Sequence, residues 1–321
     1  MRVAIIGLGL IGGSAGMAFR RAGHTVAGYA RRAATLRRAI ELGAVDEPAE
    51  TLAQAAQAEV LVLAAPVLAI RDLLADLGPL LPSGAIVTDV ASTKRQVETW
   101  ALQLLPAGVH FVGGHPMAGK ETAGIDYADG ALFRGRTWCI VPPPRASEGA
   151  VAAVAQLAAD TGALTIRMTA AEHDAMVAAT SHLPFTVSAL LCDAVLGRQG
   201  FDRLAPVAGP GLRDLTRLAS GDALMHRDIC VTNRDNLVRE LEYFSQRLAE
   251  VTALIRALPD AERASGDGAL AALEDWFRRL KQARDAWLRG AASSAEPVPP
   301  ATPAASFAEP VPPATQAPSI T

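Results

Sequence analysis

Cysteine is scarce in this chain of 321 residues. The three cysteines, Cys139, Cys192 and Cys230, are an odd number and show none of the close spacings that bind a metal ion. We therefore expect neither a disulfide framework nor a metal site. So few cysteines suit a protein of the reducing cytoplasm.

The sequence also lacks an excess of basic charge and any long apolar run near its start. Its formal net charge is −3, so it has no broad attraction for phosphate backbones or anionic lipid. The first apolar segment, Val3 to Ile6, meets glycine at once and is far shorter than a membrane span of ~20 residues. We expect no nucleic-acid partner, no membrane and a cytoplasmic location.

Half of the residues are apolar, and the length suits about two domains of ~150 residues each. Short β-branched segments alternate with helical patterns through residues 1–169. Continuous apolar strands separated by helices indicate an α/β fold with a doubly wound parallel sheet of the Rossmann type. The predicted strands are 3–6, 25–29, 60–65, 85–90, 110–114 and 137–142.

Residues 170–290 are predicted to form an all-helical second domain. Apolar residues recur at the spacing of one helix face from Leu237 through Leu241, Phe244 and Leu248 to Val251. Such a face carries more apolar surface than a thin helical layer hides, which indicates a homodimer.

Residues 291–321 are rich in proline and alanine and contain EPVPPAT twice. They are expected to form an extended, disordered tail without catalytic duty.

A dinucleotide-binding fingerprint opens the chain. Gly7, Gly9 and Gly12 form GLGLIG between the first predicted strand and a helical pattern. The glycines permit a tight turn and close approach of the backbone to a pyrophosphate, and the helix N-terminus favours its charge. The other residues expected near the cofactor at these strand ends are Leu10, Ile11, Ala65 and Pro66.

The end of the second predicted strand bears on the choice of dinucleotide. An acidic residue there would accept hydrogen bonds from the ribose of NAD. This chain has Ala30 instead, followed by Arg31 and Arg32. Two guanidinium groups without a carboxylate favour the 2′-phosphate of NADP. NAD is the alternative if both arginines are merely solvated residues at the start of a helix.

Two polar motifs follow later strands, TDVASTK over 88–94 and GGHPMAGKETAG over 113–124. Ligands of open α/β sheets bind beyond the carboxyl ends of the strands. His115 lies there between glycines and a proline, which makes it the leading candidate for chemistry.

With GLGLIGGS, EHD over 172–174, SHLPF over 181–185 and GLRDLTRLASGD over 211–222, these motifs resemble the prephenate/arogenate (cyclohexadienyl) dehydrogenase family, the TyrA-type enzymes of tyrosine biosynthesis. The resemblance extends from Arg2 to roughly Phe244. It implies a Rossmann domain, a helical domain that forms a homodimer, and oxidative decarboxylation of a cyclohexadienyl substrate with hydride transfer to NADP or NAD.

The resemblance also implies roles for single residues. His115 matches the histidine that takes the proton of the substrate hydroxyl, and Ser92 matches the serine that hydrogen-bonds that hydroxyl and the histidine. His182 and Arg217 match substrate-pocket residues, the arginine binding a carboxylate. Glu121 matches a polar position at the pocket mouth. A neutral histidine base implies that kcat rises with pH through one ionisation near ~6.5.

Several residues keep a structural interpretation. His182 is alternatively a helix-entry residue bonded to the backbone, and Ser92 alternatively caps the next helix. His173 and Asp174 are interpreted as a capping or interdomain contact. Lys94 is interpreted as a phosphate or surface contact.

Two positions depart from the family pattern. His226 stands where many relatives have tryptophan, and Lys120 where many have threonine. Both place a basic or titratable group near the expected substrate, so the choice between prephenate and arogenate stays open. Any tyrosine feedback is expected to act at the active site or the dimer interface.

Two other functions compete with this one. A β-hydroxyacid dehydrogenase or imine reductase shares the Rossmann-plus-helical plan, but the hydroxyacid type needs a lysine in the helical domain. The chain has only Lys281 after residue 120, which counts against it. A protein that senses NADP without turnover is the second alternative, and the joint presence of Ser92, His115, His182 and Arg217 is unexpected for it.

Overall fold

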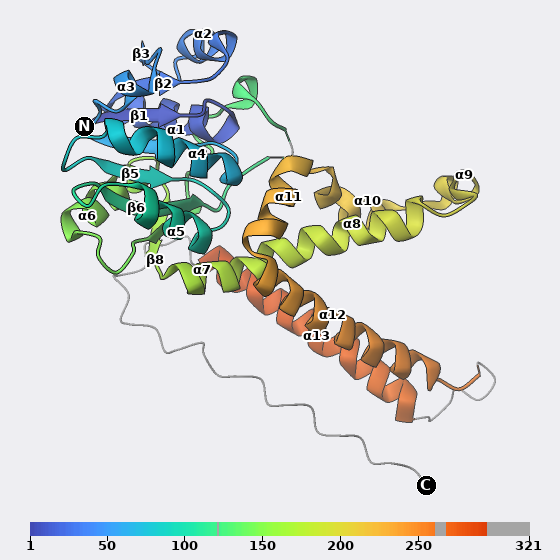
Figure 1. Cartoon of the computed structure of the whole chain (residues 1–321). Coiled ribbons are helices and arrows are strands. Elements are labelled where there is room, and N and C mark those ends of the chain that lie inside the picture. The colour runs from blue at the N-terminus through green and yellow to red at the C-terminus, as the bar shows by residue number, and fades with distance from the viewer. Residues whose placement is uncertain (121, 261–267, 294–321) are drawn as a thin grey trace. The chain divides into compact units, whose positions relative to one another are not determined.

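The computed structural model describes residues 1–120, 122–260 and 268–293 (Figure 1). Residues 1–264 form one compact unit, and a second unit begins at residue 265. The first unit is built on one eight-stranded sheet of order β3-β2-β1-β4-β5-β6-β7-β8. Its strands are β1 (Arg2–Ile6), β2 (Thr25–Tyr29), β3 (Glu47–Pro48), β4 (Val60–Leu63), β5 (Ile86–Asp89), β6 (His110–Pro116), β7 (Thr137–Val141) and β8 (Leu164–Arg167).

Both faces of the sheet are covered by helices, which is why the central strands are continuously apolar. Successive side chains of a strand point to opposite faces. Val3 and Ile5 of β1 accordingly belong to one buried cluster, and Ala4 and Ile6 to another. The doubly wound α/β fold predicted from the sequence is confirmed. The covering helices are α1 (Leu10–Arg21), α2 (Ala33–Glu41), α3 (Leu52–Ala55), α4 (Val67–Leu77), α5 (Arg95–Leu104) and α6 (Glu148–Ala159).

The sheet is not parallel throughout, and this corrects the prediction. β6 and β7 pair antiparallel, with His115 opposite Cys139. A parallel pair requires a crossover, usually a helix, whereas the described residues between 117 and 136 contain one short 3₁₀ turn, Ile125–Tyr127, and no longer helix. The prediction also missed β3, which has two residues, and β8, whose sequence LTIR is largely exposed.

A helical lobe follows the sheet, and two of its helices contact the sheet domain. α7 packs on α5, and α11 packs on α4. Figure 1 shows α8 and α12 extending away from the sheet. The lobe consists of α7 (Ala170–Val177), a π-helical turn (Ala178–His182), α8 (Leu183–Leu196), α9 (Phe201–Leu204), α10 (Pro210–Thr216), a 3₁₀ turn (Arg217–Ser220), α11 (Ala223–Thr232) and α12 (Arg234–Arg256).

The lobe exposes much apolar surface. α12 contains the predicted periodic segment, yet only Leu237 of this helix is buried. Leu248 and Ile255, about three and five turns beyond it on the same face, are exposed. The run Ala170–Leu196 is long and apolar enough to cross a membrane by length and composition alone.

The second unit contains α13 (Gly268–Ser293). This helix passes the expected boundary at residue 290 and ends three residues later. The rest of the proline-rich tail, 294–321, lies outside the described residues.

Candidate active site

The turn between β1 and α1 brings glycine backbone against a neighbouring strand. Gly7 has a φ of +105°, and a Cβ there would lie 2.3 Å from the carbonyl oxygen of Ala64. A Cβ on Gly12 would lie 1.9 Å from the carbonyl oxygen of Gly7, whereas Gly9 has open space. Glycine is therefore required at the first and third positions. The open backbone at Gly9 fits a pyrophosphate at the N-terminus of α1.

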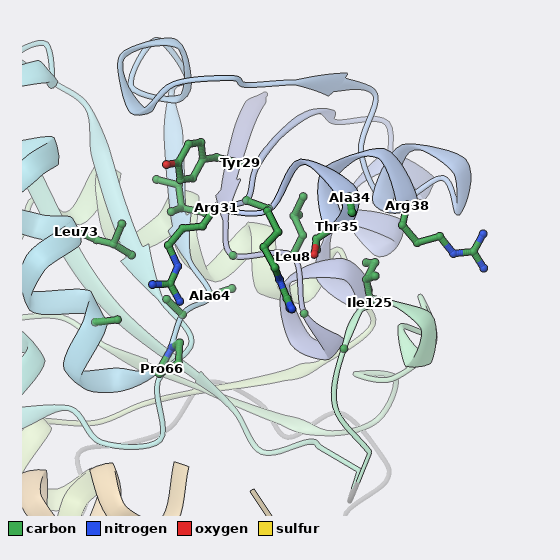
Figure 2. A pocket seen from close by; sticks show the side chains of 18 of the residues that line it. Leu8, Tyr29, Arg31, Ala34, Thr35, Arg38, Ala64, Pro66, Leu73 and Ile125 are labelled. Carbon is green, nitrogen blue, oxygen red and sulfur yellow. The ribbon is translucent and has the colours of Figure 1, made fainter. Parts of the chain in front are cut away.

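A cavity of about 1100 Å³ adjoins this turn at the carboxyl ends of β1, β2 and β4 (Figure 2). It exceeds a typical drug-sized pocket and suits an extended ligand such as a dinucleotide. The predicted cofactor residues that line it are Gly7, Gly9, Ala30, Arg31, Arg32, Ala65 and Pro66. Leu10, Ile11 and Gly12 do not line it, because the first turn of α1 packs toward the sheet, where Leu10 and Gly12 are buried.

The cavity carries unpaired positive charge at the start of α2. Arg31 and Arg32 are exposed, and neither forms an ion pair within the described part of the chain. Arg38 also lines the cavity, but its Nε donates to Asp126 at 2.7 Å, and in Figure 2 its guanidinium points away from the other side chains. Arg31 and Arg32 are therefore the cations available to a ligand phosphate.

Sequence analysis missed the acidic side of this cavity. Asp72 and Asp76 of α4 line it, and their spacing places them on one helix face. That spacing is visible in the sequence, but its meaning depends on β4 pairing with β1, which local patterns do not reveal.

His115 lies near the carboxyl end of β6 and contacts a histidine of the helical lobe. Its Nδ1 lies 2.9 Å from Nε2 of His173 in α7. Nδ1 of His173 lies 2.8 Å from Oδ1 of Asp174. His173 is completely buried, and Asp174 is 1% exposed. The structure thus joins residues 58 positions apart in one hydrogen-bonded chain.

Asp174, the last residue of this hydrogen-bonded series, is held in place because it caps α5 of the sheet domain. Its Oδ1 accepts from the backbone N–H of Lys94 at 2.7 Å, and its Oδ2 accepts from that of Arg95 at 2.9 Å. A carboxylate at the N-terminus of α5 is favoured by the unpaired N–H groups and by the helix dipole. The expected capping and interdomain contact is present, and it also orients His173.

Lys94 is not a surface contact, which corrects the sequence-based interpretation. Its side chain is 1% exposed, and Nζ pairs with Asp89 of β5 and donates to the carbonyl oxygen of Gly114 at 2.7 Å. Asp89 also accepts from the backbone N–H of Gly114 at 3.2 Å. A buried charge persists only when paired and hydrogen-bonded. The pair holds the backbone that carries His115.

The surroundings of His115 favour its neutral form. Burial lowers its pKa well below the usual value, and His173, Lys94 and His182 lower it further. Burial also lowers the pKa of His173, although Asp174 opposes this effect. The ionisation expected near ~6.5 for an unperturbed imidazole therefore lies at lower pH in this protein.

His182 ends the π-helical turn before α8 and is 1% exposed. Its Nδ1 lies 3.1 Å from Nδ2 of Asn233, which also donates to the carbonyl oxygen of Asp174 at 2.7 Å. Because the amide nitrogen is a donor, Nδ1 of His182 is the acceptor and its proton resides on Nε2. Burial lowers the pKa of His182 to about 4, so it is a neutral hydrogen-bond donor.

Two family models match the chain in order. Residues 15–167 match the prephenate dehydrogenase nucleotide-binding domain, and residues 169–265 match the prephenate dehydrogenase dimerization domain. The chain belongs to the prephenate dehydrogenase family. The resemblance carried by the ordered sequence motifs is confirmed.

Individual members of the family are similar over most of this chain. A prephenate dehydrogenase of Bacillus subtilis is 32% identical over 291 residues, which cover 88% of this chain and 74% of that protein. A cyclohexadienyl dehydrogenase of Zymomonas mobilis is 30% identical over 258 residues, which cover 79% of this chain and 88% of that protein.

Solved structures show the same likeness. The prephenate dehydrogenase from A. aeolicus, in complex with hydroxyphenyl propionate and NAD+, has a TM-score of 0.79 at 29% identity, covering 88% of this chain and 97% of that one. The arogenate dehydrogenase of Synechocystis has a TM-score of 0.75 at 31% identity, covering 89% and 100%.

Among the described residues, Ser92 and Lys120 form no hydrogen bond with His115 or His173 of this prephenate dehydrogenase family member. Ser92 is partly buried in the turn before α5 and hydrogen-bonds no described residue. It does not cap α5, because that helix begins at Arg95 with Lys94 as its N-cap. Lys120 is exposed and lies 3.6 Å from Asp129. Glu121 lies outside the described residues.

The remaining candidates of the helical lobe surround α8. The ring of His226 stacks on Phe185 with centroids 4.1 Å apart and an interplanar angle of 5°. The ring of His182 lies 5.9 Å from the same phenylalanine. Arg217 is exposed and opens the 3₁₀ turn that packs on α8. The structure thus joins His182 and His226 through Phe185, which sequence reasoning did not single out.

Proposed function

We propose that this chain oxidatively decarboxylates a cyclohexadienyl substrate, prephenate or arogenate, in tyrosine biosynthesis. The observation that carries the proposal is the neutral His115 at a strand end of a dinucleotide-binding sheet, held by His173 and Asp174. The named activities of the relatives, prephenate, cyclohexadienyl and arogenate dehydrogenase, support it.

In this proposal His115 accepts the proton of the substrate hydroxyl while hydride leaves the carbon that bears it. The ring carboxylate departs as CO₂, and the bond electrons that it leaves behind make the ring aromatic and pass to the ring oxygen, which takes the proton back from His115. A bound nicotinamide supplies the hydride acceptor. The protein therefore has mainly to position the substrate and to remove one proton.

The other polar groups are assigned to binding. His182 donates from Nε2 to a substrate oxygen, Ser92 bonds the reacting hydroxyl, and Arg217 binds a carboxylate as a planar fork. His226 and Glu121 border the substrate. These roles rest on the family resemblance and on the contacts of His182 and His226 with the same ring, that of Phe185.

NADP is the proposed cofactor, in preference to NAD. Arg31 and Arg32 line the cavity at the end of β2, and Ala30 stands where a carboxylate would repel a 2′-phosphate. Asp72 and Asp76 of α4 line the same cavity, and the NADP proposal requires that Arg31 and Arg32 outweigh their negative charge.

A cytoplasmic homodimer is the proposed state of the protein. The exposed apolar face of α12 and the match of residues 169–265 to a dimerization domain support the dimer. The three cysteines are free thiols, as suits a reducing compartment.

One set of initial rates tests the function. Reduction of NAD and of NADP is followed at 340 nm with prephenate and with arogenate, and CO₂ release is measured in parallel. We expect turnover with at least one substrate, faster with NADP, and one CO₂ per reduced nicotinamide. Binding of NADP without reduction in any combination would indicate the sensing alternative instead.

A further inference from the structure

The hydrogen-bonded chain from Asp174 through His173 to His115 determines which nitrogen of each ring carries the proton. Asp174 is an acceptor, because two backbone N–H groups already donate to its carboxylate. Nδ1 of His173 must therefore carry a hydrogen to bond Asp174 at 2.8 Å. The neutral ring then has a bare Nε2, which accepts from Nδ1–H of His115 at 2.9 Å. Nε2 of His115 therefore carries a lone pair and no hydrogen.

We propose that His173 and Asp174 are positioning residues that hold His115 in the tautomer whose Nε2 is the base. This inference rests on the proposed function for its chemistry, although the tautomer itself does not. The proton of the substrate hydroxyl moves to Nε2, and Nδ1 keeps its own hydrogen. The resulting imidazolium donates to His173, whose donation to Asp174 strengthens as charge develops. No proton has to move from His115 to His173 or from His173 to Asp174.

The charges around His115 support this role. Lys94 approaches from β5–α5 as a cation, and His182 faces it from the turn before α8. The carboxylates nearby are Asp89 of β5, which pairs with Lys94, and Asp174 of α7, which pairs with no lysine or arginine side chain among the described residues. Asp174 is therefore the negative charge available to offset an imidazolium at His115.

A role in packing alone does not explain the polar contacts of His173. Asp174 caps α5 through its carboxylate without needing a histidine beside it. His173 adds a second polar ring to a fully buried position, and its Nε2 is directed at His115. A phenylalanine there would fill the space with no polar group to satisfy.

His173→Phe is the test variant, and His24→Phe is its matched control. His24 also forms a short His–Asp contact, with Nε2 lying 2.8 Å from Asp160, but it is remote from the site. We expect His173→Phe to lower kcat ~10–10²-fold with little change in KM, and to move the low-pH limb of the kcat profile. His24→Phe should leave kcat and its profile unchanged.

A double variant separates positioning from a general loss of structure. If His173 acts through His115, adding His173→Phe to His115→Asn should lower kcat no further. A full additional ~10-fold loss in the double variant would overturn the proposal, as would an unchanged kcat in His173→Phe alone.

Histidine-selective ¹⁵N NMR tests the tautomer independently of turnover. We expect His115 and His173 in the wild-type protein to carry their hydrogen on Nδ1, and His115 to lose that preference in His173→Phe. A wild-type His115 protonated on Nε2 would overturn the inference even in an active enzyme. Absence of turnover with both substrates would overturn the proposed function while the NMR result still decides the tautomer.

Discussion

At the residue scale, the half-buried His115 and the buried His182 are held in opposite tautomers by their partners. Nε2 of His173 accepts from Nδ1 of His115, so Nε2 of His115 carries no hydrogen. Asn233 donates to Nδ1 of His182, so Nε2 of His182 carries the hydrogen. One ring therefore presents an acceptor and the other a donor. A substrate that carries both a hydroxyl to deprotonate and an oxygen to bind needs these two groups.

The low pKa of His182 predicts an acid-sensitive fold. The unfolded chain protonates His182 near ~6.5, but the folded chain does so only near 4. The stability that this shift contributes is complete above the unfolded value and is lost as pH falls from there toward 4. The loss between pH 7 and pH 4 is about 3 kcal/mol. Urea unfolding at both pH values should show a decline smaller by this amount in His182→Asn, and an equal decline in both proteins would contradict it.

Arg31 should determine the cofactor preference. Losing a charge-assisted contact to phosphate costs ~1.5–3 kcal/mol, so Arg31→Ala should lower kcat/KM for NADP about tenfold or more and spare that for NAD. Arg38→Ala is the control, because Arg38 lines the same cavity but pairs with Asp126. The same ratio of NADP to NAD efficiency in the Arg31 variant and the wild type would remove the argument for NADP.

The sequence indicates His115 as a candidate more directly than it indicates the contacts around this residue. His115 was predictable from its motif and from its place after a strand. His173 was not assigned chemistry, because its partner is 58 residues away and their contact depends on how two domains meet. Lys94 looked like a surface residue, because its burial requires Asp89 and Gly114 to close around it.

At the scale of elements, strands with strong apolar runs were predictable and their directions less so. The six predicted strands are all present, and none of their bounds differs from the observed ones by more than two residues. β8 was missed because its exposed LTIR segment lacks the apolar run of a buried strand. Whether β7 runs parallel or antiparallel to β6 depends on the segment that connects the two strands rather than on the sequence of β7 itself.

Gly114 should be essential to the seating of β6 beside β5. A Cβ there would lie 2.6 Å from the carbonyl oxygen of Asp89 and 3.0 Å from Nε1 of Trp138. Gly114→Ala should lower the free energy of unfolding by ~1–3 kcal/mol, because backbone must shift to admit the methyl group. Gly119→Ala, with open space at that position, should stay within ~0.5 kcal/mol of the wild type. Equal Tm values for the two variants would show that β6 adapts freely.

At the scale of the whole molecule, the helical lobe leaves large apolar side chains exposed to solvent. Leu190 and Leu196 of α8 are exposed, as are Leu248 and Ile255 of α12. Exposed apolar residues on the helices of one lobe are typical of an association surface. This agrees with the homodimer predicted from helical periodicity.

The proposed dimer predicts a mass in solution and a substitution that dissociates it. Sedimentation should give about twice the 33.4 kDa of the chain, and Leu248→Asp should shift the protein toward the monomer, because a buried carboxylate at the interface is unpaired. Ile40→Asp, on the exposed side of α2, is the control and should remain dimeric. A wild-type monomer at micromolar concentration with full activity would contradict the proposed assembly.

The central claim is that neutral His115 is the general base, and the pH dependence of kcat in wild type and His115→Asn tests it most directly. Burial lowers the pKa of His115, so wild-type kcat should stay level as pH falls to ~6.5 and decline only at lower pH, as the imidazole becomes protonated. His115→Asn should lose ~10²–10⁴-fold in kcat and lack this limb, while its NADP affinity and Tm stay near wild type. An asparagine variant that keeps the wild-type kcat and the same profile would contradict the claim and move the search for the base to His182 or His226.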